Sequence, residues 1–337
     1  MIDRRDHKDR GRREQFLAGL AEPDLAVEPP EPASDLLVGE EPTGAADKPH
    51  SLWTDAWWQM RRRPMFWIST ALIIIFAVMA VWPSLFTSLD PRYCLLAESR
   101  QPPGRQHWFG TDIQGCDVYA RTVYGARSSI LVGVFATLGV TVIGSFVGLV
   151  SGYFGHWLDV LLSRLGEIFF AIPTLLGGIV ILYSFPSKPD TPYFVVVGKV
   201  VLAITLLAWP SIARLMRGSV LQVMPNEYVV AAQGLGASSA RVIVSHVLPN
   251  AMAGVIAVAT INLGVYIALE ATLSFLGIGL QEPAISWGIA ISAASKMGYI
   301  TSAPHMLLFP SLFLSLTVLA FIMLGEVARD ALDPKLR

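Results

Sequence analysis

The sequence predicts an all-α protein that crosses a membrane several times, and three observations support this fold class. Apolar residues make up 53% of the 337-residue chain, and charged residues make up 15%, where soluble domains have about 25%. Six runs with at most one charge each approach or exceed the roughly 20 helical residues that cross a bilayer core. Much of the charge lies in the first 50 residues, so the remainder cannot form the polar surface of a soluble protein.

The first span is the clearest, because residues 66–86 contain no charge and follow Arg61, Arg62 and Arg63. The third span is interrupted by Pro173, the fourth carries Lys199, and the fifth carries one amide. Residues 1–60 are expected to form a disordered cytoplasmic tail. Pro and Glu recur there, and Phe16 is the single Phe, Trp or Tyr of the first 50 residues. The membrane domain is expected over 61–337, with spans at about 66–86, 130–151, 168–184, 192–212, 251–269 and 306–325.

The positive-inside rule orients the chain in the plasma membrane. Arg61–Arg63 place the N-terminus in the cytoplasm, and six spans return the C-terminus to the same side, where Arg329, Lys335 and Arg337 agree with this orientation. Residues 87–129 would then lie outside although they contain five arginines. Four acidic residues in the same stretch partly offset this positive charge. We expect a multi-pass protein with both termini in the cytoplasm.

The composition and motifs exclude several classes of function. A net charge of −1 excludes a strongly basic nucleic-acid binder. The six histidines have no second His or Cys within four residues, so no metal site is expected. A phosphate-binding loop is absent, because Gly198-Lys199 is followed by Val200 and Tyr193 stands where the first glycine is required. We therefore expect no catalysis and no bound cofactor in this chain.

Glycines follow one face of the second span. Gly144, Gly148 and Gly152 recur at intervals of four, which places them on one side of a helix. Small residues on one face let two helix backbones approach closely in a membrane. The spacing predicts that a neighbouring helix packs against this face.

The loop between the fourth and fifth spans, at about 217–250, is expected to lie in the cytoplasm and to contain two short helices. Asn226 is a good N-cap for the first helix, glycines interrupt that helix, and Ser238 or Ser239 is suited to cap the second. Pro249 would end the unit. Apolar and small side chains here would suit docking into a groove of another protein; they are Tyr228, Val229, Ala231, Ala232 and Leu235.

This loop resembles the EAA loop of the membrane permeases of bacterial ABC importers. The resemblance rests on Glu227-Tyr-Val-x-Ala231-Ala232-x-x-x-Gly236-Ala-Ser238, followed by Ile243, His246 and Leu248-Pro249-Asn250. Further stretches resemble the C-type permease of the dipeptide, oligopeptide and nickel branch, from about Arg61 to the last residue. They are Trp108–Asp112 with Gly115-x-Asp117-Val118, Tyr124–Arg127, Phe169–Pro173, Leu269–Gly277, Ser286–Gly288 and Arg329–Pro334. Cys116 departs from the family, which usually has Arg at this position.

The resemblance implies a type I importer architecture and a division of labour among several chains. The C-type permease pairs with a B-type permease, and each inserts its EAA loop into one of the cytoplasmic ATPase subunits, which carry ATP and Mg. A binding protein delivers peptides from outside, and lipid surrounds the spans. Glu227 would lie at the docking tip, and Gly236 would form the bend. The residues expected to take part in coupling are Glu227, Tyr228, Ala231, Ala232, Gly236, Ser238, His246 and Pro249.

Ionisable residues within spans are candidates for function. Glu270, at the outer end of the fifth span, would line the translocation path or an outer gate with Ser274 and Phe275, or would position the loop that follows. Lys199 would extend to the outer interface. Two alternatives remain, namely import of nickel, glutathione or another small solute by the same architecture, and an ion-driven secondary transporter coupled through Glu270 or Lys199.

Two smaller features complete the expectations. Cys94 and Cys116 both lie in the predicted outer loop, where they would form a disulfide or remain two free thiols. Arg164 and Glu167, three residues apart, are expected to form an ion pair on a helix. Which peptide or solute is carried does not follow from the sequence.

Overall fold

The computed structural model describes residues 52–188 and 190–332. The part of the tail before residue 52 lies outside the described residues. Residues 52–60, also assigned to the tail, instead belong to a helix, α2 (Leu52–Arg61). Two apolar residues attach this helix to the rest of the fold. Ala56 is buried, and the half-exposed Trp57 ring meets the edge of Phe66 with centroids 5.7 Å apart.

Among the described residues, five helices have the length and apolar composition to cross a membrane. A sixth span is present if the pair α5 (His156–Phe170) and α6 (Thr174–Ser184), bent by 80° at Pro173, counts as one. The structure therefore agrees with six spans. The five continuous ones are α3 (Pro64–Val81), α4 (Val118–Phe154), α7 (Tyr193–Val223), α10 (Leu248–Phe275) and α13 (His305–Leu332).

Three of these helices extend well past their apolar runs. α4 begins at Val118 rather than near 130, because Asp117 caps it by accepting a 2.6 Å hydrogen bond from the Ala120 amide. α5 begins at His156 rather than near 168, and α7 continues to Val223 rather than ending near 212. Polar residues end an apolar run without ending a helix, so hydropathy placed these boundaries too far inward.

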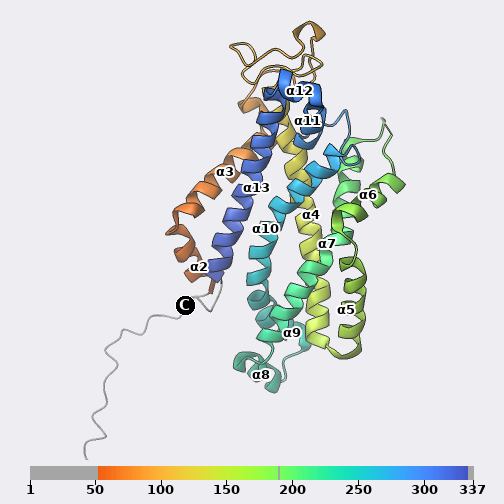
Figure 1. Cartoon of the computed structure of the whole chain (residues 1–337). Coiled ribbons are helices and arrows are strands. Elements are labelled where there is room, and N and C mark those ends of the chain that lie inside the picture. Colours follow the sequence, from red (N-terminus) through yellow and green to blue (C-terminus); the bar gives the residue numbers. More distant parts are fainter. Residues whose placement is uncertain (1–51, 189, 333–337) are drawn as a thin grey trace, which may run out of the picture. The chain divides into compact units, whose positions relative to one another are not determined.

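The core lies where α4, α7 and α10 pack together (Figure 1). α13 packs on α10 and α3 on α13, while α5 and α6 lie against α7. The glycine stripe of α4 is packed against α7, as the spacing predicts. A Cβ at Gly144 would lie 2.7 Å from the Ile212 Cβ, and one at Gly152 would lie 2.9 Å from the Val220 Cβ. Only glycine permits this approach.

The two ends of the helical body differ in structure (Figure 1). One end carries the irregular 82–117 loop with two 3₁₀ turns (Pro83–Leu85 and Leu96–Glu98), together with α11 (Trp287–Ala294) and α12 (Met297–Ser302). The other end carries α8 (Glu227–Gly234) and α9 (Ser239–Val242). A π-helical turn, Ile243–Val247, joins α9 to α10.

Candidate functional site

The coupling segment, residues 224–247, connects α7 to α10 and contains α8, α9 and the π-helical turn. Three valines anchor it. Val229, Val242 and Val247 are all fully buried and belong to the same apolar cluster as Val220 of α7 and Ala251 of α10. Val229, expected on the exposed surface, therefore faces inward, because α8 has one side against the helical body. The short helices are held by packing.

The opposite side of the coupling segment is exposed and partly apolar. Leu235 is 89% exposed, Val230 54% and Tyr228 45%. Of the other predicted coupling residues, Ala232 and His246 are half-buried. The rest are exposed, namely Glu227, Ala231, Gly236, Ser238 and Pro249. A compact surface of this kind, with small residues beside large apolar ones, suits docking of another protein.

Gly236 forms the bend between the two short helices. Its φ is +82°, in the left-handed region that residues with a Cβ rarely adopt. Its amide donates to the Gln233 carbonyl at 2.9 Å, and the Ala237 amide donates to the Ala232 carbonyl at 3.1 Å. These bonds close the end of α8.

The caps differ from the predicted ones. Asn226 occupies the N-cap position of α8, but its side-chain amide donates to the Tyr228 hydroxyl at 3.2 Å and does not cap the helix. Ser238, at the N-cap position of α9, also makes no side-chain cap. Pro249 does not end the unit: it lies in the first turn of α10, directly after the π-helical turn. The coupling segment therefore continues directly into a spanning helix. His246 strengthens this junction, since its carbonyl accepts a 2.7 Å bond from the Asn250 side chain.

An ion pair ties α5 to α7 near the coupling segment. The Arg217 guanidinium donates two hydrogen bonds to the Asp159 carboxylate, at 2.6 and 2.7 Å. The Ser151 hydroxyl of α4 donates to the same carboxylate at 2.5 Å. Sequence reasoning missed this pair, because 58 residues separate its members. The Arg164–Glu167 pair, predicted from spacing, is present at 2.7 Å on the exposed side of α5.

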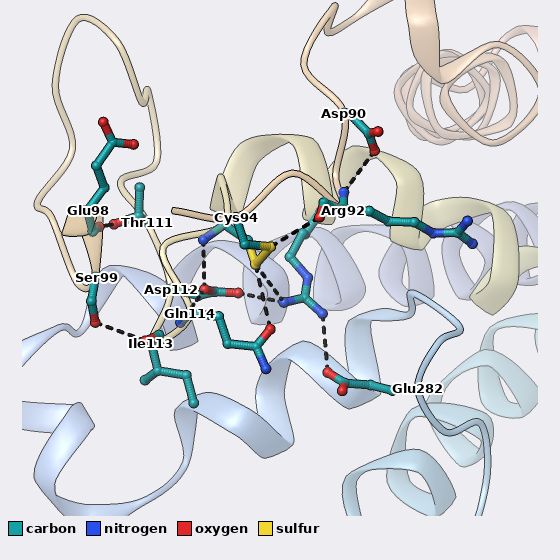
Figure 2. The surroundings of a disulfide bond; sticks show 12 residues. Asp90, Arg92, Cys94, Glu98, Ser99, Thr111, Asp112, Ile113, Gln114 and Glu282 are labelled. Carbon is teal, nitrogen blue, oxygen red and sulfur yellow. Dashed lines mark hydrogen bonds and ion pairs between the residues drawn. A yellow bond between two sulfur atoms is a disulfide. The ribbon is translucent and has the colours of Figure 1, made fainter. Parts of the chain in front are cut away.

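At the other end, Cys94 and Cys116 form a disulfide (Figure 2). Asp112 lies beside it and organises the turn: one carboxylate oxygen accepts the amides of Gln114 and Cys116 at 2.8 and 2.9 Å. The other accepts Arg121 at 2.6 Å. Arg121 also reaches Glu282 at 3.5 Å, which connects the loop to the α10–α11 connection.

Two of the five arginines that conflicted with the positive-inside rule have structural partners. Arg121 pairs with Asp112, and Arg127 donates to the carbonyls of Ala80 and Val81, both at 3.0 Å. Arg127 thereby satisfies carbonyls at the C-terminal end of α3 that lack helical partners. These local partners account for the two arginines without reference to the side of the membrane on which they lie.

Glu270 is fully buried. Its carboxylate accepts the Ser274 hydroxyl at 2.7 Å, and that hydroxyl accepts the Leu280 amide at 2.9 Å. Ser274 is 2% exposed, whereas Phe275 is 39% exposed. The observed contacts position the loop after α10, which was the alternative to a path-lining role. The path or gate role of these three residues stays a prediction.

Lys199 of α7 lies near the end that carries the 82–117 loop. Its ammonium donates to the carbonyls of Phe185 and Pro186, both at 3.2 Å. It therefore satisfies acceptors that follow the end of α6. Among residues 52–188 and 190–332, no group of three or more His, Cys, Asp or Glu side chains is arranged to hold a metal ion.

The fold and the coupling segment define a multi-span membrane protein with an exposed, partly apolar segment at one end. Comparison with known families makes the class specific. Residues 144–337 match the model described as "Binding-protein-dependent transport system inner membrane component". Residues 51–103 match "N-terminal TM domain of oligopeptide transport permease C". The chain therefore belongs to the inner-membrane permeases of binding-protein-dependent ABC transport systems and is a multi-pass inner-membrane protein.

Individual relatives place the chain within this family. It is 36% identical to the oligopeptide transport system permease protein OppC of Bacillus subtilis strain 168, with 85% of this chain and 91% of the relative covered. It is 38% identical to the dipeptide permease DppC of the same organism, over 84% and 86%. It is 33% identical to the glutathione permease GsiD of Escherichia coli O157:H7, over 89% and 96%. Among solved structures, the MetNI methionine ABC transporter matches with a TM-score of 0.47, 21% identity, and coverage of 62% and 96%.

Proposed function

We propose that this chain is the C-type permease subunit of an ATP-driven importer of oligopeptides or dipeptides. It pairs with a B-type permease and receives peptides from an extracytoplasmic binding protein. One or two cytoplasmic ATPase subunits bind ATP and Mg and supply the energy, so this chain itself is not catalytic. Both termini and the coupling segment lie in the cytoplasm, and the 82–117 loop lies outside.

The observation that carries the proposal is the two-sided coupling segment. Buried valines fix its inner side to α7 and α10, and its exposed side presents Tyr228, Val230 and Leu235. A movement of a docked ATPase would pass directly into α10, because the π-helical turn leads into it without a break. Glutathione is a second candidate substrate, since a relative named for its transport is 33% identical. An ion-driven transporter does not agree with the family.

The test measures peptide uptake and peptide-stimulated ATP hydrolysis by the complete complex, reconstituted in proteoliposomes with its binding protein. Gly236→Val forces a β-branched residue into the left-handed region, at a cost of about 1–2 kcal/mol. Because no atom lies within 4 Å of the added Cβ, the cost comes from the backbone alone. We expect this variant to abolish peptide-stimulated ATP hydrolysis.

Gly236→Asn is the matched control, because asparagine tolerates the left-handed region. It should retain most of the coupling. Uptake that continues without ATP and follows an ion gradient would refute the importer function, as would coupled hydrolysis that is unchanged in Gly236→Val.

A further inference from the structure

A cavity of about 380 Å³ lies between α4, α5 and α7. Small-molecule sites typically have volumes of about 300–1,000 Å³. The apolar lining comes from all three helices and consists of Val147, Leu162, Trp209 and Pro210. The polar lining consists of Ser151, Ser163, Glu167, Arg214 and Arg217.

The charges around this cavity do not cancel. Arg217 is neutralised by Asp159, and Arg164 is neutralised by Glu167 at 2.7 Å. Arg214 has no carboxylate partner among the described residues, and its guanidinium instead lies over the Phe170 ring, 4.2 Å from the centroid. Arg214 is exposed, so its guanidinium is available to an anion that enters the cavity. The cavity therefore carries one positive charge that no carboxylate of the described residues balances.

Arg214 follows the apolar run of α7, and its side chain extends to the interrupted span. It precedes the end of α7 by nine residues, or about 13 Å of helix. Its side chain reaches Phe170, which is the last residue of α5 before the 80° bend at Pro173. The guanidinium thus lies over the last turn of α5, at the bend of the interrupted span.

We propose that this cavity is a binding site for short peptides on the translocation path, where Arg214 binds the terminal carboxylate. An arginine offers two parallel N–H donors that match a carboxylate. The apolar lining receives peptide side chains. The hydroxyls of Ser151 and Ser163 donate to Asp159, and their oxygens accept from peptide amides. The inference rests on the proposed function and names the part of a substrate that the permease itself recognises.

The experiment measures protection of a thiol placed in the cavity. Ser163→Cys introduces it with little change in shape, and the chain has no other free thiol because Cys94 and Cys116 are bonded. The permease–ATPase complex, without binding protein, is labelled with a maleimide in nanodiscs. The label on this chain is followed with alanyl-leucine or its C-terminal amide present.

We expect the dipeptide to slow labelling about tenfold at about ten times its Kd. The amide should protect far less, because it lacks the carboxylate. Arg214→Gln should weaken dipeptide binding about tenfold or more, whereas Arg214→Lys should retain part of it. Arg62→Gln removes an exposed arginine outside the cavity and should leave protection unchanged.

Three results would overturn the proposal. They are an absence of protection by the dipeptide, equal protection by the dipeptide and its amide, or protection that Arg214→Gln leaves unchanged. Slower labelling only when phosphatidylglycerol is added to the nanodiscs would assign the cavity to a lipid and also overturn it. ATP-driven peptide uptake by the wild-type complex alongside any of these results would leave the proposed function intact, whereas loss of that uptake would refute the function itself.

Discussion

The 82–117 loop and the coupling segment are both irregular regions at the ends of the helical body, but different forces hold them. In the 82–117 loop, a disulfide, the Asp112–Arg121 pair and several side-chain hydrogen bonds to the backbone fix the chain. His107 adds a 2.7 Å contact to Asp117, the cap of α4. In the coupling segment, the described side chains make few such bonds, and buried valines provide the attachment.

This difference matches the tasks that we propose for the two ends. Polar bonds and a covalent link demand one geometry, so they suit a loop that keeps its shape. Apolar contacts are less directional, so they let a short segment shift while it remains attached. The comparison predicts that the two ends respond to different kinds of substitution.

The largest effect on stability is expected from the disulfide. Cys94→Ala with Cys116→Ala removes a link across 22 residues, which stabilises by about 3 kcal/mol in the loop-entropy treatment. Thermal unfolding of the purified complex should begin at a lower temperature. An unchanged unfolding temperature in the double variant would show that hydrogen bonds alone hold the loop.

The next effect concerns two neighbouring valines in the coupling segment. Val229→Ala removes buried methyl groups and should cost about 2 kcal/mol, because a fully buried side chain is truncated. Val230→Ala affects a side chain that is 54% exposed and should leave stability nearly unchanged while weakening ATPase binding. Unfolding temperature and co-purification of the ATPases separate the two outcomes. Equal effects of both substitutions would contradict the two-sided segment.

A smaller effect is expected at the Asp159–Arg217 pair. Asp159→Asn keeps the shape but removes the charge that holds Arg217. The two side chains are 23% and 37% exposed, so solvent screening reduces the loss to about 1–2 kcal/mol. Unfolding in detergent should register this loss at low salt and less of it at high salt.

The smallest effect is expected at Arg63 and Asp330, which pair at 2.5 Å between the start of α3 and the end of α13. Both side chains are nearly half exposed, 44% and 48%. Arg63→Gln should change stability by less than about 1 kcal/mol. A loss as large as that of Asp159→Asn would show that exposure does not rank these ion pairs.

Sequence patterns predicted the features that repeat locally. The six spans, the glycine face of α4, the Arg164–Glu167 pair and the short helices around Gly236 all follow from spacing along one segment. Features that depend on distant partners did not follow. No local signal pairs Asp159 with Arg217 or brings Arg127 to the end of α3, because a helix surface alone does not reveal its neighbour.

The glycine contact between α4 and α7 has a mechanical consequence. The helices are 37 and 31 residues long, or about 55 and 46 Å, and backbones this close cannot slide without collision. We therefore expect the two helices to move as one rigid body that runs between the two ends of the helical body. A tilt of about 10° applied at one end of α7 would displace the other end by about 8 Å. A small rotation at the coupling segment would thus produce a movement on the opposite side large enough to admit or exclude a peptide.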